Sequence, residues 1–270
     1  MKQMLLKMHG VRGSIPTPYA DRSRFGGNTS SIEIATPDTQ IFYDAGTGFA
    51  HSKFDPSAQN RLMLFSHFHH DHIQGLGFNP AIYLPDNQLR LCSALVPPER
   101  LNAILSDYYQ MPYFPVDIFG MSSHLICSDF EQTVAPLADD IRISSIELNH
   151  PGGACGYLFE TDAAKIAVLL DNEFTSSQHL MLARACEGAD LVVWDGTYTQ
   201  AELADKTGWG HSSIEQALSF SEDADIGHIL ITHHEPARTD DEITRFQSVY
   251  NSHKLSFAYE GMEFNIPASQ

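Results

Sequence analysis

Hydrophobic and polar residues alternate along the chain in short blocks, and most of the apolar blocks are too short for a buried helix. Turn residues separate these blocks, which is the pattern of β-strands joined by loops. The blocks predict strands at residues 5–9, 31–35, 40–48 (ending in a Gly-rich turn), 61–65, 81–84, 141–148, 154–160, 165–170, 190–198 and 227–232. Helices are predicted at residues 97–109, 177–188 and 214–221, and hairpins at 154–170 and 256–266. Strands mixed with helices indicate the α/β class.

Residues 86–130 depart from this pattern, and we interpret them as a variable insertion in a single domain that spans residues 1–270. The segment Leu89 to Leu91 is expected to open or belong to a helix. Residues 111–115 form a loop that two prolines make stiff and that carries two aromatic side chains. This loop is either a lid or wall for a substrate or a surface insertion that packs its own aromatic residues.

The densest chemistry in the chain lies in residues 66–72, which contain four histidines and one aspartate directly after an apolar run. Alternate side chains of an extended segment point the same way, so His67 and His69 can bind one ion, while Asp71 and His72 reach toward a second. Imidazole and carboxylate together suit zinc, manganese or iron better than calcium or magnesium. The alternative is a His-rich hydrophilic loop, but the preceding strand pattern and the turn that follows disfavour it.

Other candidate ligands follow apolar runs elsewhere in the chain. His150 comes after the strand predicted at 141–148, Asp171 after 165–170, and His233 and His234 after 227–232. A carboxylate that directly follows a buried run must be paired or bind a metal, because an unpaired buried charge costs several kcal/mol. Scattered ligands that gather at strand ends are how an α/β protein builds a site.

These motifs give the chain a resemblance to the metallo-β-lactamase superfamily. The His-x-His-x-Asp-His motif of that superfamily is matched in full by His67, His69, Asp71 and His72. Further similar segments are Arg12-Gly13-Ser14, Gly26-Gly27-Asn28-Thr29-Ser30, Asp44-Ala45-Gly46-Thr47-Gly48, His150-Pro151-Gly152-Gly153, Asp195-Gly196-Thr197-Tyr198, Gly208-Trp209-Gly210-His211-Ser212 and His233-His234-Glu235-Pro236. They resemble the branch that contains phosphodiesterases and transfer-RNA 3′-processing nucleases, over residues 4–240 except for about 86–130, which match poorly.

The resemblance implies a four-layer αββα sandwich with a dinuclear metal site at the edge of the two sheets. It assigns His67, His69 and His150 to the first ion, Asp71, His72 and His233 to the second, and Asp171 to a bridge between the two. His234 is the alternative to His233, and His70 is not needed as a ligand. The implied cofactor is two divalent metal ions, Zn²⁺ first, with Mn²⁺ or Fe²⁺ as alternatives.

Two ions about 3.5–4 Å apart can share and acidify a water molecule, and attack of that water on phosphorus is the reaction that this site fits best. The expelled alkoxide needs a proton, and His211, held by Asp195, is the candidate acid; this pairing resembles one in the transfer-RNA-processing nucleases. The alternative is that His211 only caps the helix at 214–221 while Asp195 is structural. Asp71 is a further catalytic candidate, as acceptor of the proton of the water.

The predicted function is therefore a metal-dependent hydrolase, namely a phosphodiesterase for a small substrate such as a cyclic nucleotide. The alternatives are a hydrolase of an acyl bond (lactone, thioester or β-lactam) and a transfer-RNA-processing nuclease. A non-catalytic or redox metal protein is disfavoured, because all seven ligand positions are filled and His69 stands where a diiron oxygen-reducing relative carries Glu.

Composition narrows the choice of partner and compartment. Sixteen basic and 34 acidic residues give a net charge of −18, which repels nucleic acid, whereas a metal centre can still attract a small anionic substrate. The four cysteines form no CxxC pair, so we expect reduced thiols. The first residues are too short and too charged for a signal peptide, and no apolar stretch of about 18 residues is present, so we expect a cytoplasmic protein without a membrane partner. The sequence is compatible with a homodimer.

Overall fold

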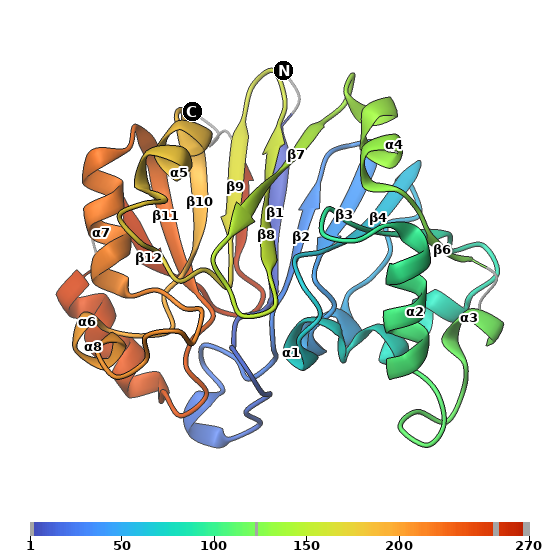
Figure 1. The fold of residues 1–270 in the computed structure, drawn as a ribbon, viewed down its shortest axis with the longest axis horizontal. Helices are drawn as coiled ribbons and strands as arrows, with labels where there is room; N and C mark the ends of the chain where they lie inside the picture. The colour runs from blue at the N-terminus through green and yellow to red at the C-terminus, as the bar shows by residue number, and fades with distance from the viewer. Residues whose placement is uncertain (1–2, 122–123, 251–253, 267–270) are drawn as a thin grey trace.

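The computed structural model describes residues 3–121, 124–250 and 254–266. Two β-sheets lie face to face in the middle of the molecule, and helices cover the outer face of each (Figure 1). This arrangement confirms the predicted four-layer αββα sandwich of the α/β class. No helix in the described ranges is long and apolar enough to cross a membrane.

The first sheet runs in the order β13-β1-β2-β3-β4-β5-β6. Its strands are β1 (Met4–Gly10), β2 (Ser31–Ala35), β3 (Thr39–Tyr43), β4 (Asn60–Phe65), β5 (Leu89–Ser93), β6 (Leu125–Cys127) and β13 (Glu263–Ile266). The pairs from β13 to β3 are antiparallel, and the pairs from β3 to β6 are parallel. Because parallel strands end at the same edge, β3 and β4 deliver their C-terminal loops side by side.

The second sheet runs in the order β12-β11-β10-β9-β8-β7. Its strands are β7 (Arg142–Leu148), β8 (Ala154–Glu160), β9 (Lys165–Leu169), β10 (Ala189–Asp195), β11 (Ile226–Thr232) and β12 (Leu255–Phe257). The hairpins β7–β8 and β8–β9 are antiparallel, and β9, β10, β11 and β12 pair in parallel. The loops after β9, β10 and β11 therefore leave the sheet at one edge.

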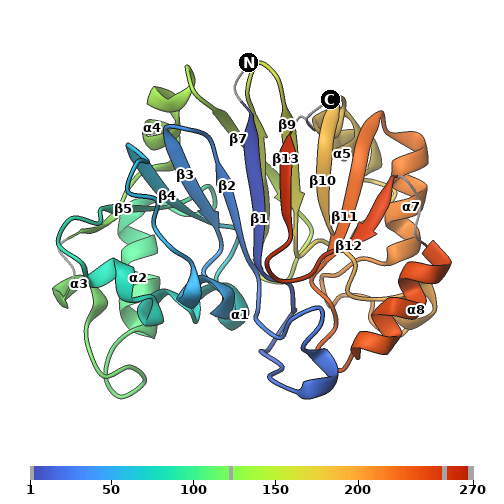
Figure 2. The same ribbon diagram turned by 180° about the vertical axis from the view of Figure 1, so that it is seen from behind.

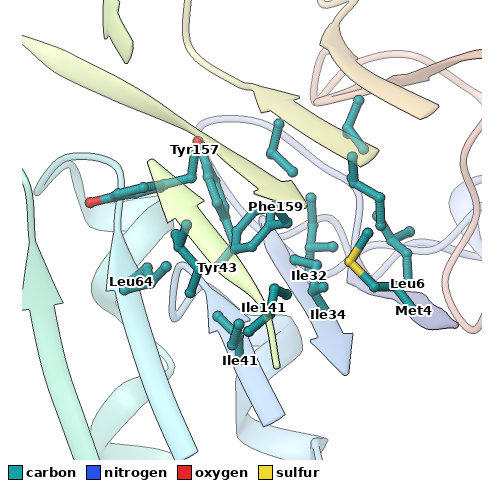
Figure 3. Packing of buried hydrophobic residues seen from close by; sticks show 14 of the residues in the cluster. Met4, Leu6, Ile32, Ile34, Ile41, Tyr43, Leu64, Ile141, Tyr157 and Phe159 are labelled. Atoms are coloured by element: carbon teal, nitrogen blue, oxygen red, sulfur yellow. The ribbon is translucent and has the colours of Figure 1, made fainter. Parts of the chain in front are cut away.

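The main core lies between the two sheets, where side chains from both inner faces interdigitate (Figure 3). Met4 and Leu6 of β1 and Ile32 and Ile34 of β2 face Phe159 of the second sheet in this layer. In β1 every second residue is buried, which is the alternation expected of a strand with one covered face. Each such fully buried aliphatic side chain contributes about 1.5–3 kcal/mol relative to an exposed one.

Two further cores lie under the helices on the outer faces. The helices are α1 (His70–Ile73), α2 (Pro98–Tyr108), α3 (Ile118–Met121), α4 (Phe130–Val134), α5 (His179–Cys186), α6 (Gln200–Leu203), α7 (Ile214–Asp223) and α8 (Asp240–Tyr250). Leu101 and Leu105 of α2 pack on the first sheet, while Leu182 of α5, Phe220 of α7 and Ile243 of α8 pack on the second. Helix α7 begins with a capping box between Ser213 and Gln216.

Three predicted elements are wrong. Residues 81–84 form no strand, because Asn79 caps a 3₁₀ helix at Pro80–Tyr83 by accepting the N–H of Ala81. Leu89 to Leu91 belong to strand β5 and not to a helix, and three residues were too few to distinguish the two periods. The hairpin at 256–266 does not exist, since β12 pairs with β11 in one sheet and β13 with β1 in the other (Figure 2).

The segment 86–130 is part of the first sheet as well as of its surface. It supplies β5 and β6, and α2 packs on these strands. Tyr109 and Phe114 are buried, with their rings edge to face at a centroid distance of 4.8 Å, whereas Tyr113 is 82% exposed. The aromatic loop therefore packs part of itself and exposes the rest beside the site described next.

Candidate metal centre

The strands that precede the predicted ligands end at the edge of the sandwich where α1 lies (Figure 1). His67 and His69 follow β4, and Asp71 and His72 lie in α1. His150 follows β7, Asp171 follows β9 after one residue, and His233 follows β11. The first sheet thus supplies four of the side chains and the second sheet three.

One set of donor atoms comes from three histidines and Asp171. The Nδ1 atom of His69 lies 2.9 Å from Nε2 of His67 and 3.1 Å from Nε2 of His150. The Oδ2 atom of Asp171 lies 3.7 Å from Nε2 of His67 and 3.6 Å from Nε2 of His150. Four donors at about 2.0–2.2 Å from a tetrahedral zinc ion lie roughly 3.3–3.6 Å apart, and the observed spacings of 2.9 to 3.7 Å lie on both sides of this range. These four donors are therefore candidates for one ion.

A second set surrounds the other oxygen of Asp171. Its Oδ1 atom lies 3.3 Å from Nε2 of His72 and 3.2 Å from Nε2 of His233. Oδ2 of Asp71 completes the set, 3.2 Å from Nε2 of His72 and 3.4 Å from Nε2 of His233. Each oxygen of the buried Asp171 therefore faces a different group of nitrogens, as a carboxylate that bridges two ions must.

The hydrogen bonding of this second set fits a cation. Nε2 of His72, Oδ1 of Asp171 and Nε2 of His233 are buried and have no hydrogen-bond partner within the described structure. Leaving three such atoms unpaired in one place is costly, because each loses its hydrogen bonds to water without replacement. A divalent cation at this second set would satisfy all three atoms, and the seven residues offer the imidazole and carboxylate donors that such ions bind.

Two histidines of the sequence motifs point away from the centre. His70 is exposed, and its Nδ1 atom lies 3.1 Å from the hydroxyl of Tyr108. His234 is buried, and its Nε2–H donates to the carbonyl oxygen of Ala258 at 2.9 Å. Of the two adjacent histidines after β11, it is thus His233 that faces Asp71 and Asp171.

Asp44 orients the ligands from behind, a role that the sequence reasoning missed. Its Oδ2 atom accepts from Nδ1–H of His72 at 2.7 Å and from the hydroxyl of Ser66 at 2.7 Å, and that hydroxyl accepts from Nδ1–H of His67 at 2.9 Å. Protonation of Nδ1 leaves the lone pair of Nε2 directed at the centre. The available signal was the position of Asp44 directly after strand β3, the same signal that identified Asp171.

Two other histidines are oriented in the same way. Nδ1–H of His150 donates to the carbonyl oxygen of Gly210 at 2.8 Å. Nδ1–H of His233 donates to Oγ1 of Thr197 at 3.0 Å, and that hydroxyl donates to Oδ1 of Asp195 at 2.7 Å. Thr197 was also missed, because no local pattern reveals which hydroxyl reaches a histidine from another strand.

Backbone strain is concentrated at this centre. Among the described residues, the non-glycine positions with positive φ are Ser14 (61°), Asp44 (58°), Asp171 (57°) and His233 (58°). All four belong to the site: three have been placed above, and the backbone N–H of Ser14 donates to Oδ2 of Asp71 at 2.7 Å. Each left-handed residue costs about 1–3 kcal/mol, a cost that is tolerated where geometry must be held for function.

The histidines of the first set are held neutral, as ligands must be. Burial lowers the pKa of His67 well below its ordinary value, and it also lowers the pKa of His150. In the second set, burial lowers the pKa of His72, but Asp171, Asp71 and Asp44 together outweigh it and raise that pKa. The carboxylates thus make the second set strongly attractive to positive charge.

His211 lies at the rim of the centre. Its ring stacks on that of His233 with centroids 5.0 Å apart, and its Nδ1–H donates to Oδ2 of the buried Asp195 at 2.8 Å. Burial lowers the pKa of His211, but the charge and the hydrogen bond of Asp195 outweigh it and raise the pKa to about 9. A pocket of about 320 Å³ opens here, lined by His211 together with Ser14, Asp71 and Asp171.

Comparisons with known proteins identify the family of the chain. Residues 39–234 match the family model described as "Beta-lactamase superfamily domain". No curated protein matches the sequence.

Among solved structures, the chain is similar to the metallo-β-lactamase fold protein YhfI from Bacillus subtilis, with 18% identity over 98% of this chain and 100% of that one and a TM-score of 0.71. The short form of human tRNase Z has 15% identity over 97% and 99% of the two chains and a TM-score of 0.70. A diphosphatase from the PhnP family has 15% identity over 98% of both chains and a TM-score of 0.67. Fold, site and family model agree, and the chain belongs to the metallo-β-lactamase superfamily.

Proposed function

We propose that the protein hydrolyses a small phosphodiester, such as a cyclic nucleotide, at a centre of two divalent metal ions held by the two ligand sets. Members of its superfamily are mostly metal-dependent hydrolases, and this general activity follows from the family. The choice of a phosphodiester rests on one observation, the His211–Asp195 pair beside the ligands. We further propose zinc as the metal, because five histidine nitrogens and a bridging carboxylate are donors that zinc prefers.

The pair supplies the proton that an alkoxide leaving group needs. Asp195 accepts the Nδ1–H of His211, so the Nε2–H of the protonated ring is free to be donated, and the ring lines the pocket. With a pKa of about 9, His211 carries this proton at neutral pH. The charge of the imidazolium also attracts a phosphodiester anion to the same place.

The other residues divide the remaining tasks. The two ligand sets would hold divalent ions, which would supply polarisation of the phosphoryl oxygens and an acidified water molecule. Asp71 is placed to accept a proton, and the N–H of Ser14 holds its Oδ2 atom in position at 2.7 Å. Asp44, Ser66 and Thr197 keep the imidazole rings aligned, so the site needs no rearrangement of its histidines during the reaction.

A small substrate is favoured over transfer RNA. The net charge of −18 opposes the approach of a polyanion, and polyanion binding relies on many Lys and Arg contacts to phosphates. Arg100 is the only basic side chain besides histidine among the residues that line the site pocket and the pocket beside it. Nuclease activity on transfer RNA is therefore the weaker alternative within the same reaction class.

Hydrolysis of an acyl bond is the second candidate function. The observation that favours it is a large apolar pocket beside the metal centre, lined by Phe78, Tyr113 and other aromatic residues, because such a mouth suits a lactone or thioester with an apolar tail. The same ligand sets can serve either reaction, so the substrate must be identified by experiment.

The test compares substrate classes with one protein preparation. Metal-loaded protein is assayed with bis(p-nitrophenyl) phosphate, 2′,3′-cyclic and 3′,5′-cyclic nucleotides, and a panel of lactones. We expect turnover of phosphodiesters that Asp71→Ala abolishes and that the exposed control His51→Ala leaves unchanged. Turnover of lactones without any phosphodiester would refute the proposal in favour of the acyl hydrolase.

A further inference from the structure

A second and larger pocket adjoins the metal centre. Its volume is about 770 Å³, within the range of small-molecule sites, and Phe68 and His70 line both pockets. The two pockets therefore adjoin at the side chains of these two residues. A molecule whose reacting group lies at the metal ligands can extend past Phe68 and His70 into the larger space.

Aromatic rings dominate this second pocket. They are those of Phe68, Phe78, Tyr108, Tyr109, Tyr113 and Phe114. The inner rings are held by one another: Tyr109 is edge to face with Phe114 and with Tyr108, each at 4.8 Å between centroids, and its hydroxyl donates to the carbonyl oxygen of Ile73. The outer rings of Phe78 and Tyr113 are 66% and 82% exposed. A fixed inner wall with two uncovered rings can pack against a flat apolar ligand.

Polar atoms are present at defined points of the same wall. The hydroxyl of Tyr108 lies 3.1 Å from Nδ1 of His70, and the amide of Gln74 donates to Oγ1 of Thr29 at 3.2 Å, which leaves the carbonyl oxygen of Gln74 as an acceptor. Arg100 is exposed, and within the described ranges its guanidinium makes no ion pair, while Asp107 brings a carboxylate to the lining. This wall suits a ring with polar edges better than an aliphatic chain.

We propose that this pocket binds the non-reacting group of the substrate, and that this group is a planar aromatic ring system joined to the phosphodiester. Phe78 and Tyr113 pack on the ring, and His70 and Phe68 separate it from the phosphoryl group at the ligands. The inference rests on the proposed phosphodiesterase function and specifies its substrate class. Phe78 and Tyr113 are thus specificity-determining residues, outside the groups that carry out the reaction.

The test uses two phosphodiesters with the same leaving group, methyl p-nitrophenyl phosphate and 2-naphthylmethyl p-nitrophenyl phosphate. We expect the wild type to prefer the naphthylmethyl ester in kcat/KM, and Tyr113→Ala and Phe78→Ala each to reduce this preference about 3- to 10-fold. The kcat/KM for the methyl ester should change less than about twofold, because both rings are exposed and neither lines the pocket at the metal ligands. Tyr259→Ala, an exposed tyrosine outside the pocket, is the matched control. An unchanged preference in both variants would overturn the proposal.

A binding measurement separates this inference from the proposed function. Calorimetric titration of the metal-loaded protein with 2-naphthylmethylphosphonate and with methylphosphonate needs no turnover. Suppose that no phosphodiester is hydrolysed, but that the naphthyl compound binds more tightly than methylphosphonate and Tyr113→Ala removes the difference. The aromatic pocket is then supported, and the proposed phosphodiesterase reaction is refuted. If both phosphonates bind alike in the wild type, the pocket assignment fails even when phosphodiesters are hydrolysed.

Discussion

Replacing Asp44 by Asn tests whether the centre depends on the residues behind its ligands. Asp44 is fully buried and accepts three hydrogen bonds, from the N–H of Ser66 at 2.8 Å, from its hydroxyl at 2.7 Å and from His72 at 2.7 Å. Asn keeps the shape but replaces one acceptor oxygen by an NH₂ donor, so at least one of these donors faces another donor. The ring of His72 then loses the partner that fixes its tautomer.

The expected effect is a loss of metal affinity of about 10- to 100-fold, or about 1.4–2.7 kcal/mol, mainly at the set that contains His72. Ser66→Ala is a matched comparison, because it removes the hydroxyl that His67 contacts at 2.9 Å but leaves the hydrogen bond from His72 to Asp44 in place. It should therefore weaken the other set instead. Chelator competition with zinc, followed by elemental analysis, measures both affinities. Affinities equal to wild type in Asp44→Asn would refute this view of the centre.

Three further predictions address the acid, a glycine and an ion pair. His211→Ala should slow a substrate with an alkoxide leaving group at least about tenfold more than a p-nitrophenyl ester, in a comparison of kcat, and equal slowing would rule out proton donation. Gly210→Ala should reduce metal content, because at φ +84° its Cβ would lie 2.1 Å from Nδ1 of His150. The control Gly208→Ala, at φ +85° with open space around it, should lose only about 1 kcal/mol of stability in urea unfolding. Metal loss in both variants would show that backbone strain, and not contact with His150, causes the loss. The side-chain hydrogen bond from Arg238 lowers the pKa of Glu202 to about 2, so the unfolded state binds more protons between this value and an ordinary Glu pKa near 4.3. The contribution of the Arg238–Glu202 pair to the free energy of unfolding should therefore be full above this pH range and decline as the pH falls through it. Glu202→Gln should flatten the pH dependence of the urea midpoint within this range. An unchanged slope would contradict the lowered pKa of Glu202.

The hydrophobic pattern predicted most strands because their signals are local, whereas the four layers were predicted from the resemblance to the superfamily. Apolar runs such as the one before His67 have the length and flanking turns of strands, and their order along the chain matches the observed elements. The position of candidate ligands directly after these runs was sufficient to expect them together, since parallel strands end at one edge. The structure does bring the seven side chains together, with Asp171 between the two sets.

Features that depend on contacts between distant segments were not predictable in this way. Strands β12 and β13 are separated by a short turn, yet their pairing with different sheets is decided by neighbours far away in the sequence. Thr197 became part of the site only because β10 and β11 lie side by side, which places its hydroxyl 3.0 Å from His233. The joining of the aromatic pocket to the metal centre likewise depends on how α2 packs on the first sheet.

The central claim is that residues from both sheets hold two metal ions that share Asp171. Its most direct test is the metal content of purified, zinc-reconstituted protein, measured by elemental analysis for the wild type and for Asp171→Ala. We predict about two zinc ions per chain in the wild type and a loss of both sets in the variant, because each oxygen of Asp171 faces one of them. Fewer than about one ion per wild-type chain, or full retention in Asp171→Ala, would contradict the account.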